Sequence, residues 1–251
     1  MMLIARRRDQ SKYPQLWDGL VGAWYPGAGP SGNTLYDLSG RDNHGTLTNG
    51  PTWVDGRGGK ALNFDGVDDY VNSPLNKTAI GNRLTISMWI YPTGSQAVKG
   101  IFQIANILSD TRPWVLLQRS TATTIKWYSN DGYRITQTVN DDEDYHLALT
   151  YDGITWRAYK NGIADGVYAG PIGVHLGGAT WLGNGYLGYF SGQLNDVRVY
   201  NRDSHVDEIK LLAQRPGIAF EPKRRVFYSI PSSVKAWLFR RQSQIIGGGL
   251  G

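Results

Sequence analysis

Turn-forming dipeptides recur at short intervals along the chain and limit the folds that it can adopt. Asn-Gly or Asp-Gly pairs stand at 49–50, 65–66, 131–132, 152–153, 161–162, 165–166 and 184–185. These pairs favour the positive φ angles of tight hairpins between antiparallel strands. Glycine supplies 32 of the 251 residues, and 9 tryptophans and 15 tyrosines accompany it. Turns at this spacing predict many short strands and few helices.

The segments between the turns are typical of β-strands. In residues 84–90 the apolar side chains of Leu84, Ile86, Met88 and Ile90 fall on one face, because successive strand residues point to opposite sides. The predicted strands are 20–24, 61–64, 70–72, 84–91, 100–104, 114–118, 124–128, 134–138, 145–151, 155–160, 179–182 and 188–200. We therefore predict an all-β sandwich or jelly roll.

One short helix is predicted over residues 204–214. Ser204 is its expected N-cap, Asp207 supplies an acidic side chain at the third position, and Pro216 ends it. After the helix the composition becomes basic and aromatic. We predict a basic N-terminal arm (1–15), a jelly-roll domain (16–214) and a basic, aromatic C-terminal extension (215–251).

The net charge of +5 is unevenly distributed. The two ends are basic and the central 16–214 carry more acidic than basic residues, so the domain is not predicted to bind nucleic acid. The absence of cysteine excludes a disulfide scaffold, a cysteine-ligated zinc site and a thiol nucleophile. No apolar run is long enough for a membrane span, and residues 1–8 lack the apolar core of a conventional secretory signal.

Seven motifs in order resemble the LamG-like jelly-roll family of the concanavalin A-like lectin/glucanase superfamily. They are GLVGAW (19–24), DLSGRDNHGTL (37–47), LNFDGVDDYV (62–71), LTISMWI (84–90), HLALTYDG (146–153), YKNG (159–162) and FSGQLNDVRVYNR (190–202). The resemblance covers about 16–214 and implies two antiparallel sheets, one concave, with any ligand on the concave side or its rim. The basic ends are similar to those of phage-borne and environmental members.

A glycoside hydrolase needs two carboxylates that flank the scissile bond. The chain has three glutamates, Glu143, Glu208 and Glu221, and none stands in the strand pattern of the family's glucanases. Asp68 and Asp69 are adjacent, and adjacent strand residues are expected to face opposite sides. The four histidines show no metal-ligand spacing. We predict no enzymatic activity.

The resemblance implies a structural calcium ion that joins an N-terminal loop to an aspartate of the last strand. The matching residues are Asp37, Asn43 and Asp196, and calcium is the one cofactor expected. The alternative is that these side chains cap turns and bond to neighbouring backbone.

A glycan site needs exposed aromatic rings beside polar groups. Strand phase favours Trp114, Trp127, Tyr128, Tyr133 and Tyr159, and Trp181, Tyr186 and Tyr189 lie near a late glycine-rich loop. The predicted glycan-binding residues are Trp114, Trp127, Tyr128, Tyr159 and Tyr186. The alternative is that these rings fill the sandwich core.

The terminal arms combine basic and aromatic residues, as protein interfaces do. The predicted assembly residues are Arg6, Arg7, Arg8, Lys223, Arg224, Arg225, Trp237, Phe239, Arg240 and Arg241.

Our first hypothesis is a non-enzymatic structural protein on the surface of a virus or phage particle, such as a capsid decoration. It would bind other virion proteins or form a homo-oligomer. The alternative is a lectin-like module for cell-surface glycans, and a glycoside hydrolase is the third.

Overall fold

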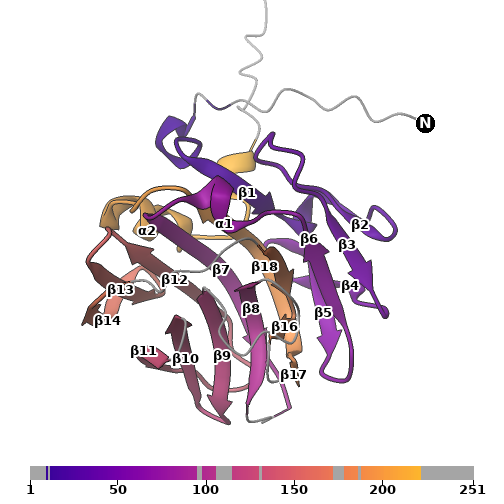
Figure 1. The fold of residues 1–251 in the computed structure, drawn as a ribbon. Coiled ribbons are helices and arrows are strands. Elements are labelled where there is room, and N and C mark those ends of the chain that lie inside the picture. The colour runs from indigo at the N-terminus through magenta and orange to yellow at the C-terminus, as the bar shows by residue number, and fades with distance from the viewer. Residues whose placement is uncertain are drawn as a thin grey trace, which may run out of the picture. The chain divides into compact units, whose positions relative to one another are not determined.

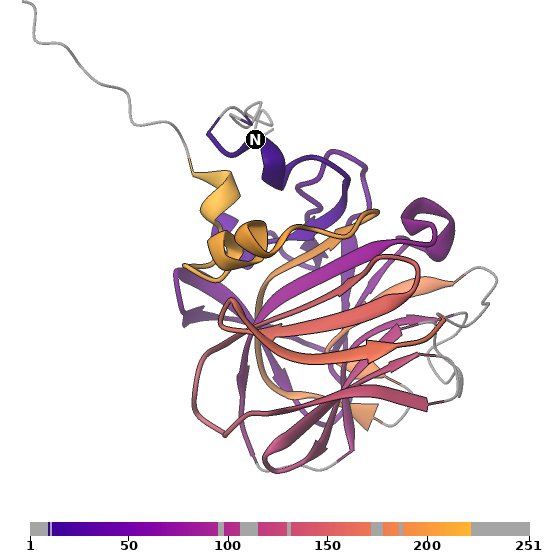
Figure 2. The ribbon, with the colours of Figure 1, turned by 90° about the vertical axis from the view of Figure 1, so that its left-hand side faces the viewer.

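The computed structural model describes residues 10, 12–94, 98–105, 115–129, 132–171, 178–185 and 188–221. They belong to a compact unit that ends at Glu221, and a second unit of residues 222–251 lies outside the described part. The described strands form two antiparallel sheets that face each other, so the predicted two-sheet jelly-roll sandwich is confirmed (Figures 1 and 2).

Sheet A has the strand order β14-β13-β12-β7-β18-β5-β4, and β1 also pairs with β18. Its strands are β1 (Leu20–Trp24), β4 (Thr52–Gly56), β5 (Gly59–Asp65), β7 (Leu84–Pro92), β12 (Tyr145–Tyr151), β13 (Thr155–Lys160), β14 (Ile163–Ala169) and β18 (Ser191–Tyr200).

Sheet B has the order β11-β10-β9-β8-β15-β6-β3-β2, with β16 and β17 joined to it through β8. Its strands are β2 (Thr34–Leu35), β3 (Gly45–Thr48), β6 (Tyr70–Ser73), β8 (Lys99–Ala105), β9 (Val115–Thr121), β10 (Thr124–Ser129), β11 (Gly132–Thr138), β15 (Ala179–Leu182), β16 (Asn184–Gly185) and β17 (Gly188–Tyr189). The helical elements are α1 (Lys77–Ile80), α2 (Val206–Leu212), and the 3-10 turns η1 (Pro14–Leu16), η2 (Pro26–Ala28) and η3 (Ile218–Phe220).

The main hydrophobic core lies between the sheets, as the alternating patterns predict. Ile86 and Met88 of β7 enter it from sheet A, and Leu117 and Trp127 enter it from sheet B. All four side chains are fully buried. The residues between them in sequence therefore point to the outer faces of the two sheets.

The hairpin between β13 and β14 shows how the turn signals act. Lys160 pairs with Ile163, which leaves Asn161 and Gly162 as a two-residue loop. Both residues have positive φ, 53° and 80°. That geometry suits Asn-Gly and fixes the strand register.

Helix α2 covers part of the outer face of sheet A, where Ile209 packs on Ala148 and Tyr159 (Figure 2). Ser204 was predicted as the N-cap, but the N-cap is His205. Its side chain and that of Glu208, at the third helical position, form a capping box. The helix therefore starts later than its acidic residues alone indicated.

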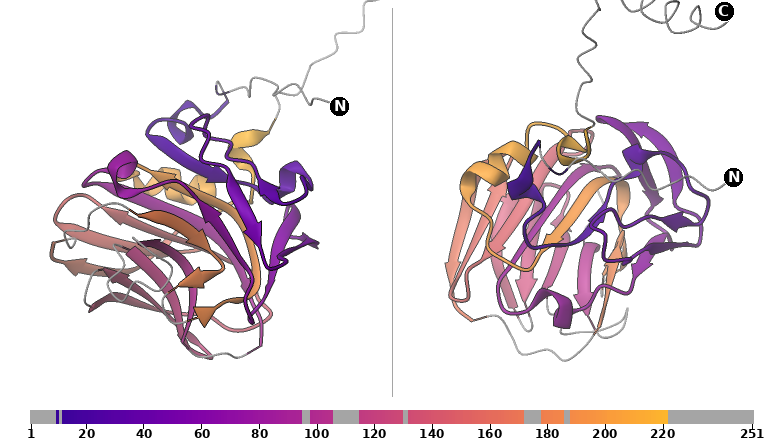
Figure 3. Two further views of the ribbon diagram at one scale, coloured as in Figure 1. Left: turned by 45° about the vertical axis from the view of Figure 1, so that its right-hand side comes forward. Right: turned by 90° about the horizontal axis from the view of Figure 1, so that it is seen from above.

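The folded unit also extends past the predicted boundary at residue 214. Ile218 and Ala219 of η3 are buried in a second apolar cluster with Leu16 and Tyr200. In Figure 3, η3 is the yellow turn at the end of the coloured ribbon. The backbone N–H of Gly217 donates to the Asp196 carboxylate at 2.7 Å. Residues 215–221 are thus part of the domain, because they cover apolar surface that β18 would otherwise expose.

Candidate functional site

The three glutamates all make contacts that stabilise local structure. Glu143 accepts a hydrogen bond from the Tyr145 hydroxyl. Glu208 holds Arg202 at 2.6 Å. Glu221 accepts from Lys12 at 2.6 Å. No two of them form the carboxylate pair that glycoside hydrolysis requires.

Asp37, a predicted calcium ligand, has its carboxylate filled by protein donors. Its Oδ1 accepts from the backbone N–H groups of Ala23 and Ser39, at 2.8 and 2.9 Å. Its Oδ2 accepts from the Ser39 hydroxyl at 2.7 Å and from the Asn43 N–H at 3.0 Å. The Asn43 side chain donates to the Val21 carbonyl. These contacts tie the 37–43 loop to β1. They are the contacts expected under the alternative hypothesis, in which these side chains cap turns and bond to neighbouring backbone.

Asp196, the third predicted ligand, lies in a buried ion pair. Its two carboxylate oxygens accept from Nε and Nη2 of Arg198, at 2.7 and 2.9 Å, and both side chains are almost fully buried. The ring of Phe220 lies 4.6 Å from the guanidinium carbon. Asp196 therefore anchors the C-terminal segment, and calcium binding stays a prediction.

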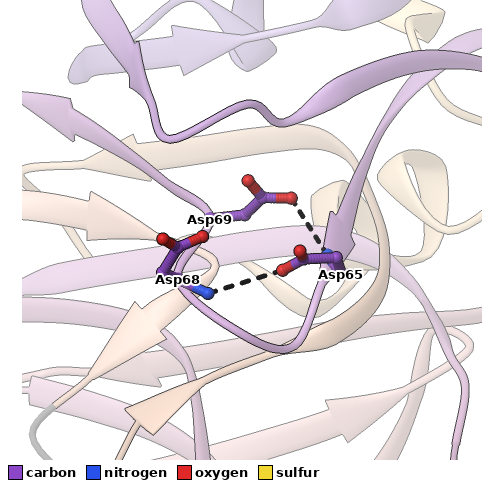
Figure 4. Close-up of side chains that lie close together, drawn as sticks. All are labelled: Asp65, Asp68 and Asp69. Carbon is purple, nitrogen blue, oxygen red and sulfur yellow. Dashed lines mark hydrogen bonds between the residues drawn. The ribbon is translucent and has the colours of Figure 1, made fainter.

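Three aspartates cluster in the turn between β5 and β6 (Figure 4). Asp65, Asp68 and Asp69 each place a carboxylate oxygen within 4.8 Å of the others. The expectation that Asp68 and Asp69 face opposite sides is wrong, because both lie in the turn before β6 begins. Asp65 accepts from the Val67 and Asp68 N–H groups, and Asp69 accepts from the Asp65 N–H at 3.0 Å. These hydrogen bonds hold the turn.

The predicted glycan-binding aromatics separate into different environments. Trp127 is in the core and donates to Gln137, and Tyr159 lies beneath α2, so both predictions are wrong. Each ring belongs to a strand that is covered on the side where it points. Tyr128 is half-buried on the outer face of sheet B. Trp114 and Tyr186 lie outside the described residues, as does the side chain of Tyr133.

The outer face of sheet B carries the arrangement most suited to a ligand. Tyr70 of β6 and Tyr189 of β17 are both half-buried, and their ring centroids are 6.4 Å apart with 34° between the planes. Asn72 is exposed on the same strand and pairs across the sheet with Trp181 on one side and Thr46 on the other. We call these five residues the tyrosine platform; Figure 1 labels three of its strands, β3, β6 and β17.

Alternation places the platform on this face. Val71 and Phe190 enter the core, so their neighbours Tyr70 and Tyr189 point outward. Among the described contacts, the two tyrosine hydroxyls and the Asn72 amide make no hydrogen bond within the protein. Tyr70 was missed from the sequence, although its strand was predicted and its phase opposite Val71 indicated an outward ring.

Strand β16 lies against the same face. A Cβ atom on Gly185 would meet the Leu116 side chain at 2.6 Å and Gln103 Oε1 at 3.2 Å. Only glycine permits this approach. On this face Trp181 is 7% exposed, whereas Tyr70, Tyr189 and Asn72 keep more open surface.

The predicted assembly residues of both arms lie outside the described part of the chain. Within the described residues, no helix has the length and apolar character needed to cross a membrane.

The sequence profile of one family, described as the concanavalin A-like lectin/glucanases superfamily, matches residues 65–210, more than half of the chain. The chain belongs to this superfamily. A comparison with curated proteins gives no match. The superfamily contains both enzymes and non-enzymes, so membership establishes the fold and leaves the activity to the site.

Solved structures of other proteins show the same fold at low sequence identity. One is domain 4 of AbnA, a GH43 extracellular arabinanase from Geobacillus stearothermophilus, in complex with arabinotriose, with TM-score 0.60 and 19% identity, covering 78% of this chain and 98% of that one. Another is the Trypanosoma rangeli sialidase in complex with sialic acid, with TM-score 0.64 and 16% identity. That match covers 78% of this chain and 32% of the sialidase.

Proposed function

We propose that the domain is a non-catalytic carbohydrate-binding module and that its ligand lies on the tyrosine platform. The observation that carries the proposal is the pair of half-exposed rings, Tyr70 and Tyr189, next to an exposed amide, Asn72. A sugar presents an apolar ring face and a rim of hydroxyl groups. Tyrosine supplies both an apolar face and a hydroxyl, and an amide supplies a donor and an acceptor.

Two further observations support this function over hydrolysis. The three glutamates are engaged in structural contacts. The platform residues include no carboxylate, and the acidic turn beside it uses its carboxylates to hold backbone N–H groups. The domain of AbnA named above was solved with arabinotriose, which makes a neutral oligosaccharide a reasonable first ligand.

Glycan binding by the purified chain tests the proposal. We expect binding to a neutral oligosaccharide in an array, followed by calorimetric titration. Tyr189→Ala should weaken the affinity roughly tenfold or more, since one aromatic contact contributes about 0.5–1.5 kcal/mol and its hydroxyl adds hydrogen bonds. Tyr189→Phe should retain part of the affinity. Val167→Ala, which trims a 70% exposed side chain on β14, is the matched control and should bind normally.

The proposal that the tyrosine platform binds the ligand would be contradicted by a protein that binds no glycan on the array. It would also be contradicted if Tyr70→Ala and Tyr189→Ala left the affinity unchanged. The role in a virus or phage particle depends on the terminal arms and stays a prediction. A mass-spectrometric search for the protein in purified particles tests that role, and removal of residues 222–251 should abolish assembly while the domain stays folded.

A further inference from the structure

We propose a second saccharide-binding surface on the outer face of sheet A, opposite the tyrosine platform. It consists of Asn63, Gln193, Tyr91 and Asn195, which we call the amide row. The inference takes its ligand class from the proposed function, but it depends on different residues and a different sheet. With both surfaces, one domain would bind two glycan segments.

The strand register places the amide row on one face. Gln193 of β18 pairs with Asn63 of β5 on one side and with Tyr91 of β7 on the other. Their sequence neighbours Leu194 and Ile90 enter the core, so the row points away from sheet B. Asn63, Gln193 and Tyr91 are all half-buried and reach the solvent.

Several polar atoms of this row have no hydrogen-bond partner within the described part of the chain. Among the described contacts, the side chains of Asn63 and Gln193 make no hydrogen bond. Asn195 is 4% exposed, and its Oδ1 is buried without a partner. Its Nδ2 donates to the Arg57 carbonyl at 3.0 Å, which fixes the orientation of the amide. A buried acceptor without a donor is unfavourable, so this oxygen marks a place where a hydrogen-bond donor is missing.

Aromatic and charged groups border this oxygen. Asn195 pairs across the sheet with Trp89, and the Arg57 guanidinium carbon lies 4.5 Å from the Trp89 ring. Arg57 also approaches the Asp144 carboxylate at 3.9 Å, and the two side chains are 47% and 33% exposed. Arg57 is therefore a half-exposed side chain that lies over the Trp89 ring, and its displacement by a ligand would open the position over Trp89.

These groups fit an uncharged sugar. A sugar hydroxyl can donate to Asn195 Oδ1, the free amides can take further hydroxyls, and Tyr91 offers a ring face. The Tyr91 hydroxyl is close to Asp142, and Asp144 borders the row, so two carboxylates oppose an acidic sugar. The two sheets of a sandwich lie about 10 Å apart, which puts the two surfaces on opposite sides of the domain.

Indole N–H signals in an NMR titration test both surfaces at once. Trp181 reports on the tyrosine platform and Trp89 on the amide row, with single Trp→Phe variants for assignment. The probes are arabinotriose and a set of neutral oligosaccharides. We expect both signals to shift. Tyr189→Ala should abolish the Trp181 shift alone, and Asn63→Ala with Gln193→Ala should abolish the Trp89 shift alone.

The outcomes separate the two proposals. A Trp181 shift without a Trp89 shift, or a Trp89 shift that survives loss of both amides, overturns the amide row and leaves the proposed function intact. A Trp89 shift without a Trp181 shift supports the amide row and overturns the platform. No shift at either indole with every probe overturns both. Thermal unfolding of each variant checks that the domain is still folded.

Discussion

His146 should make the stability of the domain depend on pH. The side chain is fully buried on β12, and its Nε2 lies 2.8 Å from the Ser87 hydroxyl while Nδ1 has no partner. Burial, assisted by the nearby Arg198 guanidinium, lowers its pKa from 6.5 to about 3. The folded protein therefore keeps this imidazole neutral at pH values where the unfolded chain protonates it.

The sign and size of the effect follow from proton linkage. Between pH 6.5 and about 3 the unfolded chain binds one more proton at this residue than the folded chain does. The contribution of His146 to stability is complete above pH 6.5 and is lost as the pH falls. The loss approaches about 1.4 kcal/mol per pH unit, or roughly 2 kcal/mol between pH 6.5 and 5.

Urea unfolding at pH 7.5, 6.5, 5.5 and 4.5 measures this loss. The wild-type free energy of unfolding should fall more steeply with acid than that of His146→Gln, and the two curves should converge as the pH decreases. His205→Asn is the matched control, because it removes an exposed histidine and retains a good N-cap residue. Parallel wild-type and His146→Gln curves would refute the reasoning.

Three further predictions concern the structural contacts. Arg198→Ala should destabilise the domain by about 3–5 kcal/mol in urea unfolding, because it leaves the Asp196 carboxylate buried without its partner; a loss below 1 kcal/mol would contradict the ion pair. A chain that ends at Glu221 should keep its Tm, and one that ends at Gln214 should lose several degrees, since η3 closes the second apolar cluster. EDTA should leave the Tm unchanged, because Asp37 and Asp196 already have protein partners; a fall that calcium reverses would support the calcium hypothesis instead.

Alternating patterns and turn signals predicted the sandwich because both follow directly from strand geometry. Residues 84–91 were predicted as a strand and form β7 (Leu84–Pro92). Strand β14 was missed, because it lies at the edge of sheet A with both faces largely exposed and no alternation. The domain end was placed too early, since the burial of Ile218 depends on contacts with residues about 200 positions away, such as Leu16.

The candidate site was harder to predict than the fold. Strand phase shows that a ring alternates with its neighbours, but it does not show which face is covered. Trp127 and Tyr159 both follow the alternation of their strands, yet both rings are covered. Trp127 points into the core, and Tyr159 points to the outer face that α2 covers. Tyr70 and Tyr189 are more than 100 residues apart in the chain, and their rings come together only in the folded sheet, where β6 pairs with β15 and β17 pairs with β8.

A crystal structure of the domain with the best oligosaccharide from the array tests the central claim most directly. We predict a sugar ring in contact with Tyr70 and Tyr189, with hydroxyl groups within hydrogen-bond distance of the tyrosine hydroxyls or the Asn72 amide. A bound saccharide that leaves the outer face of sheet B unoccupied would contradict the claim.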